Sequence, residues 1–273
     1  MVINQKDISA NVTLALIEDV GSGDITAELI PEDASASAIL VTHEHAVVAG
    51  SQWFEEVFNQ LPGNTTINWN VSDGDVITPE QKLCTINGSA RSLLTGERTA
   101  INFLQTISAT ATTVASFVDI IKDTKTKILD TRKTIPGLRL AQKYAVSCGG
   151  GANHRIGLYD AILIKENHIM AAGSIMQAVI KAREKKLHIE VEVESLIELE
   201  EALKAKVDQI LLDNFDLPSL EKAVNINQGR AKLEASGNIN KDNLYDIAKT
   251  GIDYISIGAL TKHIRAIDFS MRM

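Results

Sequence analysis

The sequence is poor in cysteine, in aromatic residues and in long apolar runs. Its 273 residues include two cysteines, Cys84 and Cys148, and 4% aromatic residues. Without a CxxC spacing, two cysteines provide neither a disulfide framework nor a paired-cysteine metal site. We therefore expect both to be reduced core residues. The chain also lacks the roughly 18 consecutive apolar residues of a membrane span and an apolar amino-terminal stretch flanked by basic residues, which predicts a cytoplasmic protein.

Positive charge is scarce as well. Lys and Arg number 27 against 35 for Asp and Glu, so the formal net charge is −8. This balance argues against nucleic acid or an anionic membrane surface as the main partner. Basic residues nevertheless gather between positions 127 and 169, among tracts that look buried. Such a cluster at strand ends predicts a receptor for a small molecule with several negative charges. Its members are Arg132, Lys133, Arg139, Lys143, His154, Arg155, Lys165 and His168.

The first part of the chain mixes helical and strand-like patterns. Helical spacing covers residues 8–18 and 51–61, and strand-like runs cover 38–42, 65–71 and 82–86. These predict an amino-terminal α+β layer domain over residues 1–105. A longer helical pattern then runs from residue 90 to residue 122.

Beyond residue 122, strand-like and helical patterns alternate. The alternation predicts a parallel sheet built from six βα units. A complete (βα)₈ barrel needs two more strands, so we predict an α/β fold with an incomplete six-unit βα barrel over residues 106–265. The six predicted strands are 127–131, 160–165, 187–193, 208–213, 231–235 and 252–257.

Several charged residues fall where these strands end. Arg132 and Lys133 follow the first strand, Lys165 follows the second, and the loop between the two carries His154 and Arg155. The carboxyl ends of parallel strands form the edge at which α/β enzymes place their sites. A helix is predicted to begin at Pro136 and to end before the glycines at 149–151.

Carboxylates mark the third and fourth strands. Residues 187–194 alternate, with Glu190, Glu192 and Glu194 on one face. A half-exposed strand gives the same alternation, but a strand covered on both faces requires cations or a metal ion beside those carboxylates. Asp213 ends the next strand and either joins Glu192 around Mg²⁺ or caps the following helix.

Two turns of small residues follow the last two strands. They are Ser236-Gly237-Asn238 and Ile257-Gly258-Ala259. Backbone N–H groups in such turns bind phosphate in α/β barrels, although a simple tight turn has the same composition. No GxxxxGK[ST] motif is present, so a P-loop is not indicated.

Seven collinear blocks give the chain a family resemblance. Residues 127–169, with TRKTIPGLRLAQKYAVSCGGGANHR and DAILIKENHI, resemble the signature of the quinolinate phosphoribosyltransferases. The other similar blocks are EDVGSGDIT (18–26), ARSLLTGERTAINFLQ (90–105), VEVE (191–194), LLDNF (211–215), EASGNI (234–239) and SIGALTKH (256–263). The resemblance covers nearly the whole chain. It implies an incomplete α/β barrel fused to an amino-terminal α+β sandwich domain over residues 1–105, which the carboxyl-terminal tail 266–273 joins. One departure is Asn238, where the family commonly has a second glycine; Asn tolerates a left-handed φ, so we expect the loop to survive.

The resemblance implies roles for individual residues. Arg132, His154 and Arg155, with Arg98 from the neighbouring subunit of a homodimer, are expected to bind quinolinate. Lys133, Lys165, Glu192 and Asp213 are expected to be catalytic, with Mg²⁺ held by Glu192 and Asp213 through water or substrate. Phosphoribosyl pyrophosphate would contact these same four residues together with Ser236, Gly237, Asn238, Ile257, Gly258, Ala259 and His263.

The implied reaction joins quinolinate to phosphoribosyl pyrophosphate and gives nicotinate mononucleotide, pyrophosphate and CO₂. No organic cofactor is expected. Three alternatives stay open at this point. The first is a related phosphoribosyltransferase for another heterocyclic acid, and the second is a non-catalytic phosphate-sensing barrel. The third, a phosphosugar isomerase or aldolase barrel, is disfavoured because Lys133 and Lys165 lie among many cations.

Overall fold

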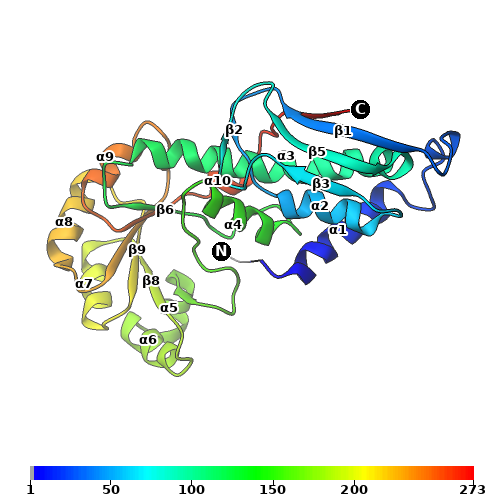
Figure 1. Cartoon of the computed structure of the whole chain (residues 1–273). Coiled ribbons are helices and arrows are strands. Elements are labelled where there is room, and N and C mark those ends of the chain that lie inside the picture. The colour runs from blue at the N-terminus through cyan, green and yellow to red at the C-terminus, as the bar shows by residue number, and fades with distance from the viewer. Residues whose placement is uncertain (1–2) are drawn as a thin grey trace. The chain divides into compact units, whose positions relative to one another are not determined.

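The computed structural model describes residues 3–273, which divide into two compact units. Among the described residues, the first unit combines 3–115, 135–150 and 261–273, and the second combines 116–134 and 151–260. Both units are thus assembled from segments that are distant in the sequence (Figure 1). The predicted boundary at residue 105 separates the chain differently and stays a prediction.

The first unit contains an antiparallel sheet with the order β12-β1-β5-β3. Its strands are β1 (Ser35–Thr42), β3 (Thr66–Trp69), β5 (Lys82–Ser89) and β12 (Phe269–Arg272). Leu40 of β1 pairs with Cys84 of β5 on one side and with Met271 of β12 on the other. Strands β2 (Ala46–Val47) and β4 (Val76–Ile77) form a separate short pair.

Helices complete the core of this unit. They are α1 (Gln5–Asp19), the 3₁₀ helix η1 (Ala27–Leu29), α2 (Ser51–Gln60), α4 (Arg139–Cys148) and residues 90–115 of α3 (Ala90–Ile120), whose last turn is assigned to the second unit. Asn4 caps α1 by accepting a hydrogen bond from the Lys6 N–H at 3.0 Å. Trp53 of α2 is fully buried, and its ring centroid lies 5.7 Å from that of Tyr144 on α4. The helices and strands predicted before residue 122 are all present, with boundaries shifted by a few residues.

The predicted start of α4 at Pro136 is wrong. The helix begins at Arg139, and residues 135–138 form a turn in which the Leu138 N–H donates to the Ile135 carbonyl at 3.1 Å. Gly137 has a φ of 80°, which suits the third position of a type II turn that carries proline at the second. The Ile135 N–H donates to the Gln142 side chain at 2.8 Å, so a tertiary contact fixes the turn.

The second unit is built around a six-stranded parallel sheet with the order β6-β11-β10-β9-β8-β7. The strands are β6 (Lys127–Leu129), β7 (Ile162–Ile164), β8 (Ile189–Val193), β9 (Gln209–Asp213), β10 (Lys232–Ser236) and β11 (Tyr254–Ser256). Helices α5 (Glu166–Ala172), α6 (Ile175–Arg183), α7 (Leu196–Lys204), α8 (Leu217–Asn227) and α9 (Leu244–Lys249) alternate with them. The short helix α10 (Ala259–Lys262) follows β11. All six predicted strands are confirmed.

This sheet is open between β6 and β7, which are its two edge strands. Residue Ala152 makes an isolated parallel bridge to Leu129 of β6, so the loop before β7 begins alongside the open edge. The predicted incomplete six-unit βα arrangement beside an amino-terminal sheet is confirmed. No helix in residues 3–273 is both long enough and apolar enough to cross a membrane.

The central strand β9 offers a test of this core. Ile210 is 0% exposed, whereas Ile197 on α7 is 75% exposed. Ile210→Ala removes packed methyl groups and should lower the free energy of unfolding by about 2–5 kcal/mol. The matched change Ile197→Ala should stay within about 0.5 kcal/mol of the parent. Urea unfolding of both variants measures the difference, and equal losses would contradict the described packing.

Candidate active site

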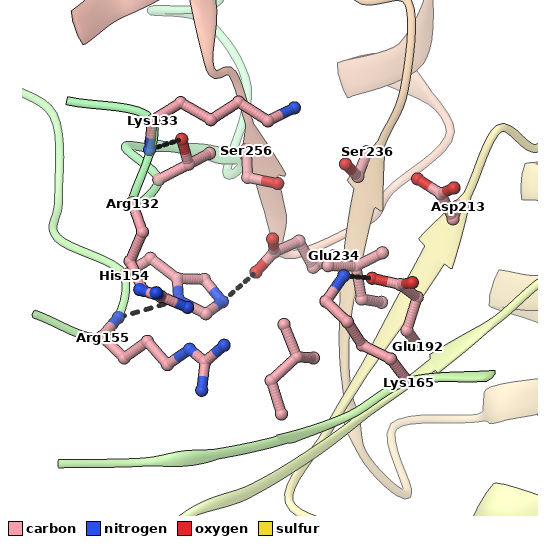
Figure 2. A pocket seen from close by; sticks show the side chains of 13 residues that line it. Arg132, Lys133, His154, Arg155, Lys165, Glu192, Asp213, Glu234, Ser236 and Ser256 are labelled. Carbon is pink, nitrogen blue, oxygen red and sulfur yellow. Dashed lines mark hydrogen bonds and ion pairs between the residues drawn. The ribbon is translucent and has the colours of Figure 1, made fainter. Parts of the chain in front are cut away.

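A cavity of about 440 Å³ opens at the carboxyl ends of the parallel strands. Every residue that lines it belongs to the second unit, and charged side chains converge on it from several strand ends (Figure 2). The lining residues are Thr131, Arg132, Lys133, His154, Arg155, Leu163, Lys165, Glu192, Leu211, Asp213, Glu234, Ser236 and Ser256. The sequence interpretation had singled out Arg132, Lys133, His154, Arg155, Lys165, Glu192, Asp213 and Ser236, and the structure brings these together.

The turn after β6 delivers two of the cations. The Lys133 N–H donates to Thr131 Oγ1 at 3.1 Å, and the Thr134 N–H donates to the Arg132 carbonyl at 3.0 Å. The Lys133 side chain packs against Gly258. A Cβ atom added to Gly258 would lie only 2.7 Å from Lys133 Cδ. Gly258 therefore leaves the room through which Lys133 reaches the cavity.

Two aspartates hold the loop that carries His154 and Arg155. Asp130 is fully buried at the end of β6 and accepts from the His154 N–H at 2.9 Å and from Asn153 Nδ2 at 2.7 Å. Asp160 accepts from the N–H groups of Ile156 at 2.7 Å and Gly157 at 2.9 Å. These carboxylates fix the loop by accepting hydrogen bonds from its backbone N–H groups. In a closed barrel, additional strands would bind such groups through ladder hydrogen bonds.

The imidazole of His154 is engaged on both nitrogens. Its Nδ1 lies 2.8 Å from the backbone nitrogen of Arg155, which donates to it, and its Nε2 lies 2.7 Å from Glu190 Oε2. Since Nδ1 accepts a hydrogen bond, the ring hydrogen of a neutral His154 lies on Nε2. His154 thus contacts a ligand through a ring nitrogen only by giving up one of these bonds.

A buried group of polar side chains lies beneath the cavity. Gln209 Nε2 donates to Glu190 Oε1 at 3.0 Å and to Glu234 Oε2 at 2.6 Å. Glu190 and Glu234 are 2% and 0% exposed. Burial, and then the charge of Glu190, raise the pKa of the Glu234 carboxyl well above its ordinary value.

The same group could be taken for a metal site, because His154, Glu190 and Glu234 each place one ligating atom within 4.8 Å of the others. Gln209, however, directs amide hydrogens at both carboxylates, and His154 donates to one of them. Hydrogen bonds therefore occupy three of the four carboxylate oxygens, which leaves few ligands for a cation. The basic partner of Glu190 is His154, a member of the cluster predicted to balance these carboxylates, and Gln209 adds an amide donor.

Glu192 does pair with a cation. Its Oε2 forms a short hydrogen-bonded ion pair with Lys165 Nζ, at the end of the neighbouring strand β7. The Lys165 side chain is 46% exposed and Glu192 is 16% exposed, so the pair stands at the cavity surface. Anionic ligands can therefore compete for Lys165.

Asp213 points into the cavity from the end of β9, where its Oδ2 accepts from Asn214 Nδ2 at 2.7 Å (Figure 2). The alternative reading, an aspartate that caps the next helix, applies instead to Asp216. Asp216 is the N-cap of α8 and accepts from the Ser219 N–H at 2.9 Å. Asp213 is thereby left to face the cavity.

The two predicted phosphate turns lie directly after β10 and β11. Gly237 has a φ of 96°, and a Cβ there would lie 2.1 Å from Asn214 Oδ1. Asn238 adopts the expected left-handed conformation, with a φ of 51°. The Ile257 N–H already donates to the Leu129 carbonyl at 3.1 Å, so a phosphate bound at Ile257, Gly258 and Ala259 would use other groups.

Two predicted residues lie in segments of the first unit. Arg98 is on α3 and His263 follows α10, and both side chains are exposed. Their predicted contacts with substrate stay predictions.

The sequence interpretation missed the lining residues Thr131, Leu163, Leu211, Glu234 and Ser256. For Glu234 a signal existed, because it precedes Ser236 by two residues on the same strand, and alternate residues share a face. The buried Asp130 was read only as part of a strand.

The charge pattern identifies the kind of ligand. Burial, and then the charge of Arg132, lower the pKa of the Arg155 guanidinium, because two like charges lie close together in a partly buried place. A bound anion relieves that repulsion. Cations and carboxylates gathered at the carboxyl ends of a parallel α/β sheet define an enzyme that acts on a small polyanionic molecule.

Comparison with known proteins places the chain more closely. Residues 24–108 match the model of the quinolinate phosphoribosyl transferase N-terminal domain, and residues 110–272 match that of the C-terminal domain. The chain belongs to the quinolinate phosphoribosyltransferase family. It is 40% identical to the "Probable nicotinate-nucleotide pyrophosphorylase [carboxylating]" of Bacillus subtilis over 93% of this chain and 89% of the relative.

Solved structures agree with this placement. The nicotinate-nucleotide pyrophosphorylase of Francisella tularensis has a TM-score of 0.96 at 48% identity, over 99% of this chain and 97% of the other. NadC from Streptococcus pyogenes also has a TM-score of 0.96, at 41% identity over 100% and 98%. The fold is therefore shared along the whole chain.

The raised pKa of Glu234 predicts a pH dependence of stability. Between the ordinary carboxyl pKa and the raised one, the folded protein retains a proton that the unfolded chain has released. The free energy of unfolding should therefore fall as pH rises through this window. Glu234→Gln should remove that part of the slope, which urea unfolding at a series of pH values measures.

Glu56→Gln is the matched control. Glu56 is also buried, at 8% exposure, but hydrogen bonds from Gln60 and Ser9 outweigh the effect of burial and lower its pKa. Glu56→Gln should leave the slope of unfolding free energy against pH unchanged between the ordinary carboxyl pKa and the raised pKa of Glu234. If Glu234→Gln keeps the parent's slope, the proton is held elsewhere.

Proposed function

We propose that the protein transfers the phosphoribosyl group of phosphoribosyl pyrophosphate to quinolinate in NAD biosynthesis. The 2-carboxylate is lost as CO₂, and nicotinate mononucleotide and pyrophosphate are formed. The observation that carries the proposal is the convergence of Arg132, Lys133, Arg155 and Lys165 with Glu192 and Asp213 on one cavity. Family membership supports the same reaction.

Quinolinate carries two carboxylates, which suits the closely spaced guanidiniums of Arg132 and Arg155. Guanidinium groups bind carboxylates through paired, charge-assisted hydrogen bonds. Binding also removes the mutual repulsion that lowers the pKa of Arg155. His154, whose ring nitrogens are both engaged, serves first to place Arg155, since the Arg155 N–H donates to it.

Phosphoribosyl pyrophosphate suits the remaining charged groups that line the cavity. Lys133 and Lys165, with His263, would neutralise the departing pyrophosphate. Glu192 and Asp213 would stabilise the positive charge that develops on the ribose as its C1–O bond stretches. The turns at 236–238 and 257–259 would receive the 5-phosphate.

The donor set also fits the predicted Mg²⁺. Glu192 and Asp213 lie on adjacent strands and both line the cavity, and their carboxylate oxygens are ligands that Mg²⁺ prefers to share with substrate phosphates. When bound, the ion supplies charge neutralisation for the leaving pyrophosphate. Once the pyridine nitrogen bears ribose, the ring itself accepts the electron pair left by CO₂, so the reaction requires no organic cofactor.

We also propose a cytoplasmic homodimer in which Arg98 of each subunit completes the site of the other. The exposed position of Arg98 on α3 is compatible with such a contribution. The support for this arrangement is the ERTAINFLQ motif at residues 97–105 and its family resemblance.

Selection of quinolinate over nicotinate tests the proposed binding of two carboxylates by Arg132 and Arg155. Nicotinate lacks the 2-carboxylate, so binding it leaves a desolvated cation unpaired, and sites of this kind reject such analogues by about 10⁴-fold. Mixing the protein with phosphoribosyl pyrophosphate, Mg²⁺ and either acid, followed by mass detection of the nucleotide, should give product from quinolinate alone. Comparable turnover of both acids would refute the proposed role of Arg132 and Arg155.

Arg155→Ala should reduce quinolinate binding by about 2–5 kcal/mol, because the truncation leaves a substrate carboxylate unpaired. Arg272→Ala, which alters an exposed ion pair with Glu80 in the first unit, is the matched control and should bind normally. Isothermal titration measures both. Equal affinities in the two variants would remove Arg155 from the quinolinate site.

Shared sites predict complementation between inactive variants. Arg98→Ala and Lys133→Ala homodimers should each be nearly inactive, while a heterodimer contains one site with both residues intact. Mixing them under subunit exchange, verified with differently tagged chains, should recover part of the parent's activity. Verified exchange without recovery would place Arg98 outside the partner's site.

A further inference from the structure

One carboxyl group beneath the cavity has no use in the reaction as described so far. Glu234 is fully buried, yet it lines the base of the cavity. Its Oε2 accepts from Gln209 at 2.6 Å, whereas Oε1 lies toward the Ser256 hydroxyl and has no hydrogen bond of standard geometry among the described residues. Figure 2 shows one carboxyl oxygen directed at the His154 ring and the other toward Ser256. A buried carboxylate oxygen without a donor is costly, whereas a protonated oxygen there is itself a donor.

The neighbouring groups determine which carboxyl holds the proton. Glu190 accepts hydrogen bonds from both His154 and Gln209. Glu234 receives one from Gln209, and its second contact, to His154 Nε2, is 3.7 Å long. Two buried carboxylates that share one amide do not both stay ionised. The proton therefore belongs on Glu234 Oε1, which faces away from Gln209.

The proposed reaction needs one proton. When the C2–carboxylate bond breaks, CO₂ leaves without the electron pair, which stays on C2 of the pyridinium ring. The product carries hydrogen at that carbon. We propose that Glu234 is the acid that supplies this proton from the base of the cavity. In this step the O–H bond of Glu234 breaks, its electron pair stays on oxygen, and the C2–H bond forms. The assignment rests on the proposed function.

The charges around Glu234 suit this role. A neutral acid does not repel a dianionic substrate, whereas a carboxylate in the same place would. A dianion bound at Arg132 and Arg155 further favours the protonated form of Glu234. Substrate binding therefore increases the fraction of Glu234 that carries the proton. The other charged groups on the cavity are Lys133, Lys165, Glu192 and Asp213, and Glu190 faces Glu234 from β8.

A second cavity gives the acid a route to recover its proton. It has a volume of about 230 Å³ and is lined by residues at the amino ends of the strands, including Lys127, Gln209 and Tyr254. Its lining also includes His154, Arg155 and Glu190, so the buried group lies between the two cavities. Water in the second cavity can return a proton to Glu234 through this group without passing the bound product.

A single-turnover experiment with Glu234→Gln tests the assignment. The protein, in excess over quinolinate, is mixed with phosphoribosyl pyrophosphate and Mg²⁺, and pyrophosphate and CO₂ are measured in the same sample. The parent should release the two together. The variant should still release pyrophosphate, while CO₂ lags by about 10²-fold to 10⁴-fold, the usual contribution of a positioned acid. The undecarboxylated nucleotide should then be detected by mass.

The outcomes separate the two proposals. A parent that releases neither product overturns the proposed function itself. If the parent is active and Glu234→Gln releases CO₂ together with pyrophosphate at the parent's rate, Glu234 is not the acid. An equal fall in both products also overturns the assignment, because it indicates a role in binding or transfer. Glu56→Gln controls for the loss of a buried carboxylate and should behave like the parent.

A second measurement uses the parent protein without any substitution. Quinolinate is titrated into the parent in buffers of different ionisation enthalpy, from neutral to alkaline pH. Binding should take up as much as one proton per site as the pH rises, because the dianion raises the proton affinity of Glu234. Absence of uptake throughout the series overturns the assignment. Where Glu234→Gln folds and binds quinolinate, it should show no uptake, and uptake equal to the parent's would place the proton on another group.

Discussion

The anchoring of one loop by carboxylates is the constraint on which the site depends. The parallel sheet ends at β6 and β7 without closing, and residues 151–161 form the last part of the connection between these two edge strands. Asp130 and Asp160 take the place of ladder hydrogen bonds by accepting backbone N–H groups of that loop. Glu190 then fixes the His154 ring, and His154 in turn accepts the N–H of Arg155. The backbone that carries the cavity-lining Arg155 is thus positioned by three acids.

Much of this arrangement could be predicted from the sequence, for a physical reason. Strands covered on both faces appear as apolar runs such as Ile210 to Leu212, and a polar residue that ends such a run lies at the rim of the sheet. Arg132, Lys165 and Asp213 were recognised in this way, and all three line the cavity. Their individual roles came from the family resemblance, because a position at a strand end specifies no chemistry.

The remainder depended on contacts that no local pattern contains. Pro136 has the local features of a helix start, but the Gln142 side chain binds the Ile135 N–H and keeps residues 135–138 in a turn. Glu190 and Glu192 look equivalent in the sequence. Only the structure shows that one lies under the cavity beside Gln209 and the other at its surface beside Lys165. The pKa of Glu234 likewise depends on a neighbour from another strand.

The interleaved construction of the two units bears on the order in which they form. The antiparallel sheet of the first unit pairs Thr42 of β1 with Phe269 of β12, and this unit's residues 261–273 follow the whole of the second unit in the chain. During synthesis from the amino terminus, every segment of the second unit leaves the ribosome before that sheet can receive its edge strand. The site-bearing sheet can therefore assemble first, and β1 keeps an unpaired edge until the final residues arrive, the stage at which exposed strands are most prone to wrong pairing.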